Sequence, residues 1–357
     1  MRILVVTPDY VSHLYPLIPL ALGLRASGHQ VTFGTGPSIA QQVRRWGFGV
    51  SPLVQGYESN QGLADVTSNP QVAKSLQASE ESWLASIVDQ ARNRVEGLFY
   101  DGLNVARRTI AVVKELRPDY VISVQLSYGA ALGLFTWGGP FVTYVTGHPN
   151  QLPREDAIYG DPGRMPLCFS ASSDQLRQAR YACQLAQETF TDEFNLAATR
   201  LGWSPNSWAN GLAAASPTQV YYNFPRNFDD LESRARDVRT TYLGPQVRPS
   251  GLTTIEKRWV SQSQSDRRRI VYVGLGSYFS NSRGTTAKLI AALGKTDHAV
   301  AFSAGHLTDY VKSLAPSHWL VSPYLSQPSL LSSADLAISH GGNNSFNEAY
   351  SAILIDG

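Results

Sequence analysis

The first 34 residues constrain the fold more than any other part of the chain. Residues 2–7 are a short apolar, β-branched run, which is typical of a strand buried on both faces. Residues 16–24 carry apolar side chains at helical spacing, and Gly28 supplies a helix stop before a second strand at residues 30–34. This order predicts a βαβ unit, and hence a parallel sheet with a ligand crevice at the carboxyl ends of its strands.

The rest of the first half continues this pattern. Residues 71–116 predict helices, and residues 118–124 and 140–145 predict two further strands. An irregular region rich in aromatic residues, proline and glycine follows, with a helix predicted over residues 173–200. Insertions of this kind in a wound domain usually shape a substrate mouth.

A second series of strands and helices begins at residue 269. Before it, residues 246–268 combine proline, serine and charges, which is typical of a linker. Two wound units joined by a linker predict a cleft between them, where ligand sites are common. The predicted organisation is a first domain over residues 1–245, a linker over 246–268 and a second domain over 269–357.

Composition and charge exclude several classes of function. The 357-residue chain has a formal net charge of +2 and no basic stripe, so we expect no nucleic-acid partner. Cys168 and Cys183 have neither metal spacing nor a disulfide framework, which favours a reducing compartment, the cytoplasm. The sequence contains no run of about 18 uncharged apolar residues, so we expect no transmembrane segment. The apolar start lacks a small-residue cleavage site, so we expect it to belong to the folded chain.

Two glycine-containing turns are candidates for binding an anion. Residues 274–277, Gly-Leu-Gly-Ser, follow a predicted strand, so their backbone N–H groups could face a phosphate. A tight turn without any ligand explains the same residues equally well. Residues 340–345, His-Gly-Gly-Asn-Asn-Ser, combine close backbone approach with side-chain donors and a helix start near Asn344, and predict a phosphate site.

Two further residues carry open alternatives. Glu348 could accept hydrogen bonds from sugar hydroxyls, or it could complete a capping box with Ser345. His13 lies in the turn after the first predicted strand, where a histidine could act as a general base. It could also be a helix-terminal histidine that only packs and caps.

Together these residues resemble the GT-B glycosyltransferases, specifically the nucleotide-sugar-dependent family that decorates natural products, macrolides and small lipophilic acceptors. The segment PLIPLALGLRASGHQVTFGTG is similar to the start of that family, and IVYVGLGS, YLSQPSLLSSADLAISHGG and NNSFNE match its donor site in order and spacing. The resemblance implies an α/β GT-B fold, in which two Rossmann-like domains with parallel sheets face each other across a cleft.

The resemblance also implies a reaction and the residues that perform it. The reaction is an inverting transfer of a sugar from a UDP- or TDP-sugar to a hydroxyl of a small lipophilic acceptor, without a metal or a cofactor. His13 matches the general base, Tyr324 and Gln327 match positions that contact the pyrimidine base, and Glu348 matches the position that holds the ribose. The implied donor-binding residues are Gly276, Ser277, Tyr324, Gln327, His340, Gly341, Gly342, Asn344, Ser345 and Glu348.

The chain departs from the family pattern in three places. Ser12 replaces the glycine that usually precedes the basic histidine. The acidic residue that commonly orients this histidine is replaced by Gln125, and although Gln125 or Ser127 could orient His13, neither can stabilise an imidazolium by charge. Only nine residues follow Glu348, where the family has further strands and a last helix, so the second domain is predicted to be incomplete, with residues 353–357 entering the next strand.

These departures keep two other functions open. The chain could be a catalytically impaired or non-catalytic GT-B relative that binds an acceptor, a nucleotide or a partner enzyme. It could also carry another GT-B activity, such as nucleotide-sugar epimerisation, which would turn over donor without acceptor. The sequence leaves open whether the protein forms a homodimer.

Overall fold

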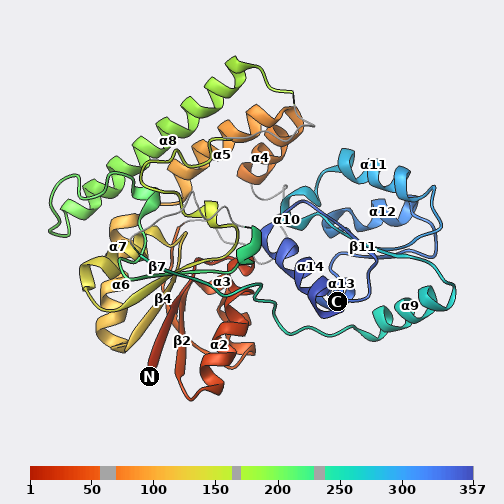
Figure 1. Ribbon diagram of the computed structural model, residues 1–357, viewed down its shortest axis with the longest axis horizontal. Coiled ribbons are helices and arrows are strands. Elements are labelled where there is room, and N and C mark those ends of the chain that lie inside the picture. Colours follow the sequence, from red (N-terminus) through yellow and green to blue (C-terminus); the bar gives the residue numbers. More distant parts are fainter. Residues whose placement is uncertain (57–69, 163–169, 229–237, 357) are drawn as a thin grey trace. The chain divides into compact units, whose positions relative to one another are not determined.

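The computed structural model describes residues 1–56, 70–162, 170–228 and 238–356, which form two compact α/β units (Figure 1). The first unit contains most of the residues up to Gly244, and the second consists mainly of the residues from Pro245 onward. Cys183 is a buried free thiol, whereas Cys168 lies outside the described residues.

The first unit is built on a seven-stranded parallel sheet. The strand order is β3-β2-β1-β4-β5-β6-β7, and β1 pairs in parallel with β2, with Leu4 opposite Thr32. The βαβ unit predicted from the first 34 residues is therefore confirmed. The strands are β1 (Arg2–Val6), β2 (Gln30–Thr35), β3 (Gly49–Pro52), β4 (Tyr120–Val124), β5 (Phe141–Val145), β6 (Gln219–Tyr222) and β7 (Arg239–Tyr242).

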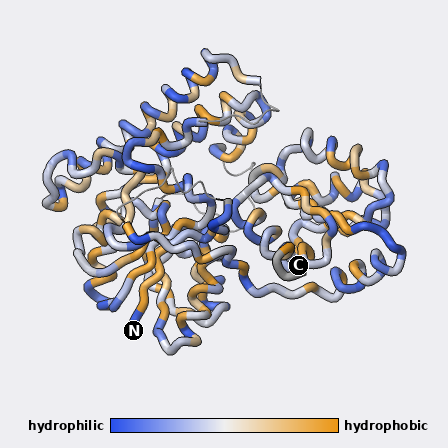
Figure 2. The backbone as a smooth tube through the Cα atoms, in the orientation of Figure 1, coloured by the Kyte–Doolittle hydropathy of each residue, from blue (hydrophilic) through white to orange (hydrophobic). Residues whose placement is uncertain are grey.

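Helices cover both faces of this sheet because alternate strand residues point to opposite faces. Val5 packs with residues of α1 (Val11–Leu14), α2 (Leu17–Ala26) and α3 (Pro37–Arg45). Its neighbours Leu4 and Val6 pack instead against α6 (Gly102–Leu116) and α7 (Tyr128–Trp137). Strands β1 and β5 are consequently buried at nearly every position, and the strands at the centre of this sheet are mostly orange in Figure 2.

The long helix α8 (Ser173–Thr199) confirms the helix predicted in the irregular region. It packs along α5 (Trp83–Gly97), next to α4 (Pro70–Glu81) in the chain (Figure 1). Phe190 and Phe194 of α8 form an aromatic cluster with Phe99 and Tyr128. Short 3-10 turns complete this unit: η1 (Pro149–Gln151), η2 (Gly211–Ala213) and η3 (Arg226–Phe228).

The second unit is built on a four-stranded parallel sheet of order β10-β9-β8-β11. Its strands are β8 (Ile270–Gly274), β9 (Ala299–Ser303), β10 (Leu320–Ser322) and β11 (Leu336–Ser339). Its helices are α9 (Thr254–Ser265), α10 (Gly276–Phe279), α11 (Arg283–Leu293), η5 (Gly305–Leu307), α12 (Thr308–Leu314), α13 (Gln327–Leu331) and α14 (Asn343–Asp356).

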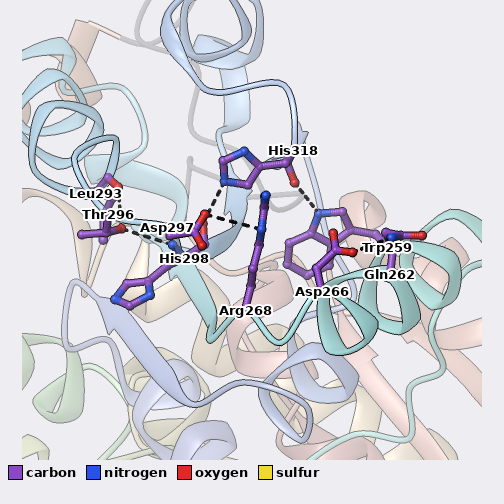
Figure 3. Close-up of polar contacts among 9 residues, drawn as sticks. All are labelled: Trp259, Gln262, Asp266, Arg268, Leu293, Thr296, Asp297, His298 and His318. Atoms are coloured by element: carbon purple, nitrogen blue, oxygen red, sulfur yellow. Dashed lines mark hydrogen bonds and ion pairs between the residues drawn. The ribbon is translucent and has the colours of Figure 1, made fainter.

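The segment predicted as a linker, residues 246–268, contains helix α9, which packs into the second unit. Val260 is buried with Ile270 of β8, and Trp259 packs beside them. Figure 3 shows the polar contacts at this end of the sheet: Trp259 Nε1 donates to the His318 carbonyl oxygen at 2.9 Å, and Arg268 pairs with Asp297 at 3.6 Å. Arg268 and Asp297 precede β8 and β9, so these contacts fix the amino ends of the strands.

The last helix of the described chain corrects one expectation. Residues 353–357 are predicted to enter a strand, but α14 continues to Asp356. No glycine or proline interrupts residues 343–356, and good helix formers such as Ala349 and Ala352 let the helix propagate. Strand β11 lies at the edge of the sheet, where the Leu336 side chain is 52% exposed.

Candidate functional site

The two predicted anion-binding turns of the second unit lie side by side at the carboxyl edge of its sheet. Strands β8 and β11 pair in parallel, with Gly274 opposite Ser339. Because carboxyl ends of parallel strands meet at one edge, the residues that follow both strands are brought together. The site therefore combines residues 274–277 with residues 340–345, more than 60 positions later.

Glycines 276 and 342 leave room for the ring of His340 between them. A Cβ atom on Gly276 would lie 2.3 Å from His340 Cε1, and one on Gly342 would lie 2.4 Å from Nε2. Gly276 also has a φ of +69°, which favours glycine on its own account. From the sequence we expected these glycines to leave room for a ligand. In the structure Gly276 and Gly342 leave room for the His340 side chain. Gly341 differs, since it has a φ of +74° and open space around its Cα.

The His340 ring is held by a hydrogen bond to the backbone of Gly274. Burial of the ring lowers its pKa, and a hydrogen bond to the Gly274 backbone opposes this shift without cancelling it. His340 is consequently neutral at pH 7. One ring nitrogen donates to the Gly274 carbonyl oxygen, so in the neutral ring the other nitrogen is an acceptor, and it can donate to a ligand only when it carries a second proton.

Helix α14 directs its amino terminus to the same edge. The helix begins at Asn343, and the Phe346 N–H donates to the Gly342 carbonyl oxygen at 2.9 Å. Asn344 and Ser345 thus lie in the first turn, where backbone N–H groups and the helix dipole favour an anion. The capping-box alternative is wrong, because Ser345 would have to precede the helix and instead lies inside it.

A buried chain of hydrogen bonds connects three elements of the second unit. Gln327, the first residue of α13, accepts from Tyr272 Oη of β8 at 2.9 Å. Its amide nitrogen donates to Glu348 Oε2 at 2.6 Å and to Ser345 Oγ at 3.3 Å. Both ends of this amide are engaged by protein groups. The structure therefore shows Gln327 holding Glu348, and its implied contact with a pyrimidine base stays a prediction.

Glu348 is buried, with 7% of its surface exposed. Burial raises the pKa of its carboxyl group, while the hydrogen bond from Gln327 and the charge of Arg248 lower it. A carboxylate held in this way presents its acceptor atoms in a defined direction. Such a group could accept hydrogen bonds from vicinal hydroxyls.

Tyr324 stands in the loop after β10 and is 56% exposed. Arg248 Nη2 donates to its hydroxyl oxygen at 2.5 Å. Arg248 is not predicted from the sequence, because it lies in the predicted linker, 76 positions from Tyr324. The available signal is the tyrosine itself, whose hydroxyl can accept a hydrogen bond.

In the first unit, His13 lies in the short helix α1, directly after the carboxyl end of β1. The half-buried ring packs against Tyr10, with ring centroids 5.6 Å apart, and Ser12 Oγ lies 3.3 Å from Nδ1. Burial lowers the pKa of His13 to about 4. The imidazole is therefore neutral at pH 7 and able to accept a proton.

The two residues suggested as partners of His13 have other surroundings. Gln125 is buried at the end of β4, but its amide donates to the hydroxyl of Tyr128. The Ser127 hydroxyl is buried and has no hydrogen-bond partner among the described residues. The Ser12 hydroxyl does contact the His13 ring, and Ser12 occupies the position where the family usually has glycine.

Asp9 is the acidic side chain nearest to this turn in the sequence, and it has a structural role. Its carboxylate accepts from the backbone N–H groups of Ser38 and Ile39 at 3.1 and 3.0 Å. These are first-turn donors of α3, so Asp9 satisfies the start of that helix. A Cβ atom on Gly36 would lie 2.5 Å from the same carboxylate, which explains the glycine there.

The described residues contain neither a candidate metal cluster nor a candidate membrane-spanning helix. Within residues 1–56, 70–162, 170–228 and 238–356, no cluster of three or more histidine, cysteine, aspartate or glutamate side chains could hold a metal ion. In the same residues no helix combines the length and the apolar character needed to cross a bilayer.

Comparison with known sequences gives one short match. No family model matches the chain. An uncharacterized UDP-glucosyltransferase of Bacillus subtilis (strain 168), YdhE, is 28% identical over 103 residues, which are 29% of this chain. The match spans 26% of the length of that protein. It therefore relates a part of the two chains.

Comparison with solved structures covers nearly the whole chain. The glycotransferase of kitacinnamycin has a TM-score of 0.64 at 20% identity, over 98% of this chain and 78% of that one. The glycosyltransferase SnogD from Streptomyces nogalater gives 0.62 at 18% identity, over 99% and 79%. The glycosyltransferase VinC in complex with DTDP gives 0.59 at 18% identity, over 98% and 78%. The chain thus has the GT-B fold that the family resemblance implies.

Proposed function

We propose that this protein is an inverting glycosyltransferase that moves a sugar from a UDP- or TDP-sugar to a hydroxyl of a small lipophilic natural product. The observation that carries the proposal is the carboxyl edge of the second sheet. There a histidine held between two glycines, the start of α14 and a fixed buried glutamate occur together. These are groups suited to a diphosphate and to a ribose.

The comparisons support the same class of donor. VinC, which shares the fold, was solved with DTDP, and YdhE is described as a UDP-glucosyltransferase. Pyrimidine nucleoside diphosphates are therefore the first ligands to test. The proposed contacts are Tyr324 on the base, Glu348 on the ribose and His340 on the diphosphate. Gly342, Asn344, Ser345 and Ser277 complete the proposed diphosphate site.

In the proposed reaction His13 is the general base. Ser12 contacts Nδ1, so we assign proton acceptance to Nε2. As the proton leaves the acceptor hydroxyl, its oxygen bonds to the anomeric carbon, and the bond from that carbon to the diphosphate breaks. The electron pair of the broken bond leaves on the diphosphate oxygen. Donors at the start of α14, and His340 once it has taken up a proton beside the diphosphate, would stabilise that developing charge.

Replacing His13 separates binding from chemistry. We expect His13→Ala to lower sugar transfer to a panel of lipophilic hydroxyl compounds at least about 100-fold, because a general base contributes that much or more. Its affinity for UDP and TDP should stay unchanged in calorimetry, and His29→Ala is the matched control. Transfer at the wild-type rate in His13→Ala would remove the assigned role.

The pH profile tests the environment of His13. Its neutral form persists down to about pH 4, so the transfer rate should stay level from pH 8 to 6 and fall only as the pH drops through the lowered pKa. A rate that halves near pH 6.5 would instead indicate a histidine in water.

A nucleotide-binding relative without transfer activity is the second candidate. It is favoured by the surroundings of Gln125 and Ser127: within the described residues the Gln125 amide donates to Tyr128 and the Ser127 hydroxyl has no hydrogen-bond partner, so neither orients His13 as an acidic residue would. Donor consumption that requires the acceptor panel supports the transferase. A shift of the melting temperature by UDP or TDP without consumption of any donor supports the second candidate.

A further inference from the structure

Arg248 connects two groups that the proposed function assigns to one nucleotide. It lies in the segment before α9, and its Nη2 donates to the hydroxyl oxygen of Tyr324 at 2.5 Å. Burial raises the pKa of the buried acid Glu348, and the charge of the same guanidinium opposes this rise. One arginine therefore bonds to the exposed tyrosine and acts by its charge on the buried acid.

A second carboxylate holds this segment in place. Glu256 of α9 is 3% exposed and accepts from the backbone N–H groups of Thr253 and Ser326, each at 2.7 Å. Burial alone would raise the pKa of Glu256, but these N–H groups outweigh it and lower the pKa. Glu256 thus joins the start of α9 to the loop that carries Tyr324. The chain around Arg248 and the chain around Tyr324 are consequently fixed to each other.

The groups that face Glu348 come from several elements. Gln327 of α13 donates to its carboxylate, and Ser345 of α14 shares that amide. The phenol of Tyr272, on β8, is near enough for the charge of Glu348 to raise its pKa. Among the described residues that act on the pKa of Glu348, Arg248 supplies the positive charge.

Resting on the proposed nucleotide-binding function, we propose that Arg248 is a positioning residue of the nucleotide site, which holds the Tyr324 ring by its hydroxyl for stacking on the base and supplies a positive charge for the side of the site that carries Glu348. A guanidinium suits this task because its donors lie in a planar fork and it stays protonated. One N–H can serve the phenol while the charge faces the acid. A lysine offers the charge without the fork.

Removal of Arg248 has a consequence with a definite sign. Glu348 already has a raised pKa from burial, and the loss of a nearby cation raises it further. A protonated acid loses acceptor strength toward ribose hydroxyls. The nucleotide affinity of an Arg248 variant should therefore begin to fall at a higher pH than that of the wild type, as the pH is lowered.

The experiment is calorimetric titration of UDP and TDP into the full chain between pH 8 and 5. We expect Arg248→Met to bind at least tenfold more weakly at pH 7, with the fall in affinity displaced to higher pH. Tyr324→Phe keeps the ring but removes the acceptor of the hydrogen bond, so it should lose about threefold with an unchanged pH profile. Arg248→Lys should retain most of the pH profile. Arg258→Met, on an exposed position of α9, is the matched control.

The outcomes distinguish this proposal from the function on which it rests. A wild-type chain that binds neither nucleotide contradicts the proposed function itself. A wild-type chain that binds, together with an Arg248→Met variant of equal affinity and equal pH profile, overturns the role of Arg248. Melting temperatures without nucleotide identify a variant that has merely lost its fold. In that case Tyr324→Phe and Arg248→Lys decide the question. Tyr324→Phe should lose about threefold in nucleotide affinity with an unchanged pH profile, and Arg248→Lys should retain most of the wild-type pH profile; a Tyr324→Phe variant of wild-type affinity overturns the role of Arg248.

Discussion

The carboxyl edges of the two sheets are equipped differently. At the edge of the second sheet the polar groups are paired: the Gln327 amide is engaged at both ends, and His340 bonds the Gly274 backbone. At the edge of the first sheet Gln125 is paired with Tyr128, but Ser123 and Ser127 have buried hydroxyls without hydrogen-bond partners in the described part of the chain. The second edge is thus preorganised for a ligand, whereas the chemistry assigned to the first depends on one histidine.

An inner strand of the first sheet and an edge strand of the second differ in burial. Strand β5 of the first sheet is buried at all five positions, since helices cover both of its faces. The edge strand β11 of the second sheet is mostly exposed, whereas its inner strand β8 is buried at all five positions. Burial of an apolar side chain stabilises by about 1.5–3 kcal/mol. Equal truncations should therefore have very unequal effects at inner positions and on the edge strand β11.

The largest expected effect tests this difference in burial. Leu4 is 1% exposed, so Leu4→Ala should lower the free energy of unfolding by about 2–5 kcal/mol. Leu336 is 52% exposed, so Leu336→Ala should change it by about 0.5 kcal/mol or less. Leu330→Ala, at a position with 0% exposure in the second unit, is the control and should resemble Leu4→Ala. Chemical denaturation measures all three, and equal losses at Leu4 and Leu336 would contradict the comparison.

A smaller effect is expected from crowding the preorganised edge. Gly276→Ala places a methyl group against His340 at a positive φ, so the ring has to move out of its slot. We expect at least tenfold weaker binding of UDP or TDP, about 1.4 kcal/mol. Gly284→Ala, in α11 with open space around it, should bind as the wild type does. Calorimetry decides, and unchanged affinity in Gly276→Ala would mean that the position of His340 does not matter.

The smallest expected effect concerns the unpaired groups of the first edge. Ser127→Ala removes a buried hydroxyl that has no partner among the described residues, so the free energy of unfolding should fall by no more than about 0.5 kcal/mol, or should rise. Gln125→Ala removes the donor to the buried Tyr128 hydroxyl and should cost about 1 kcal/mol or more. Thermal unfolding of the two variants compares them. A larger loss in Ser127→Ala would show that its hydroxyl has a partner after all.

The sequence predicted the strands well because each is a short apolar run between turn residues. Residues 30–34 and 140–145 were expected as strands, and the bounds of β2 and β5 agree with them to within one residue. Helix α9 was missed because proline, serine and charge dominate its surroundings. The available signal was Thr253 followed three residues later by Glu256, which form a capping box in the structure.

Side-chain partners were harder to predict than strands. Pairing of β8 with β11 brings residues 274–277 and 340–345 to one edge, and the sequence alone did not predict it, because these strands are neighbours in the sheet but not in the chain. The partners of Gln125 and Gln327 were not predicted either, since an amide can bond to any neighbour within reach and the choice depends on packing. Arg248 and Tyr324 illustrate the same limit, because no periodicity links positions so far apart.

The central claim is that the carboxyl edge of the second sheet binds a pyrimidine nucleoside diphosphate. Titration of UDP and TDP into the wild-type chain and into Glu348→Gln tests it most directly. We expect at least one nucleotide to bind the wild type, and at least about tenfold weaker binding when the charge of Glu348 is removed. If neither nucleotide binds the wild type at millimolar concentration, or if Glu348→Gln binds equally well, the account is contradicted.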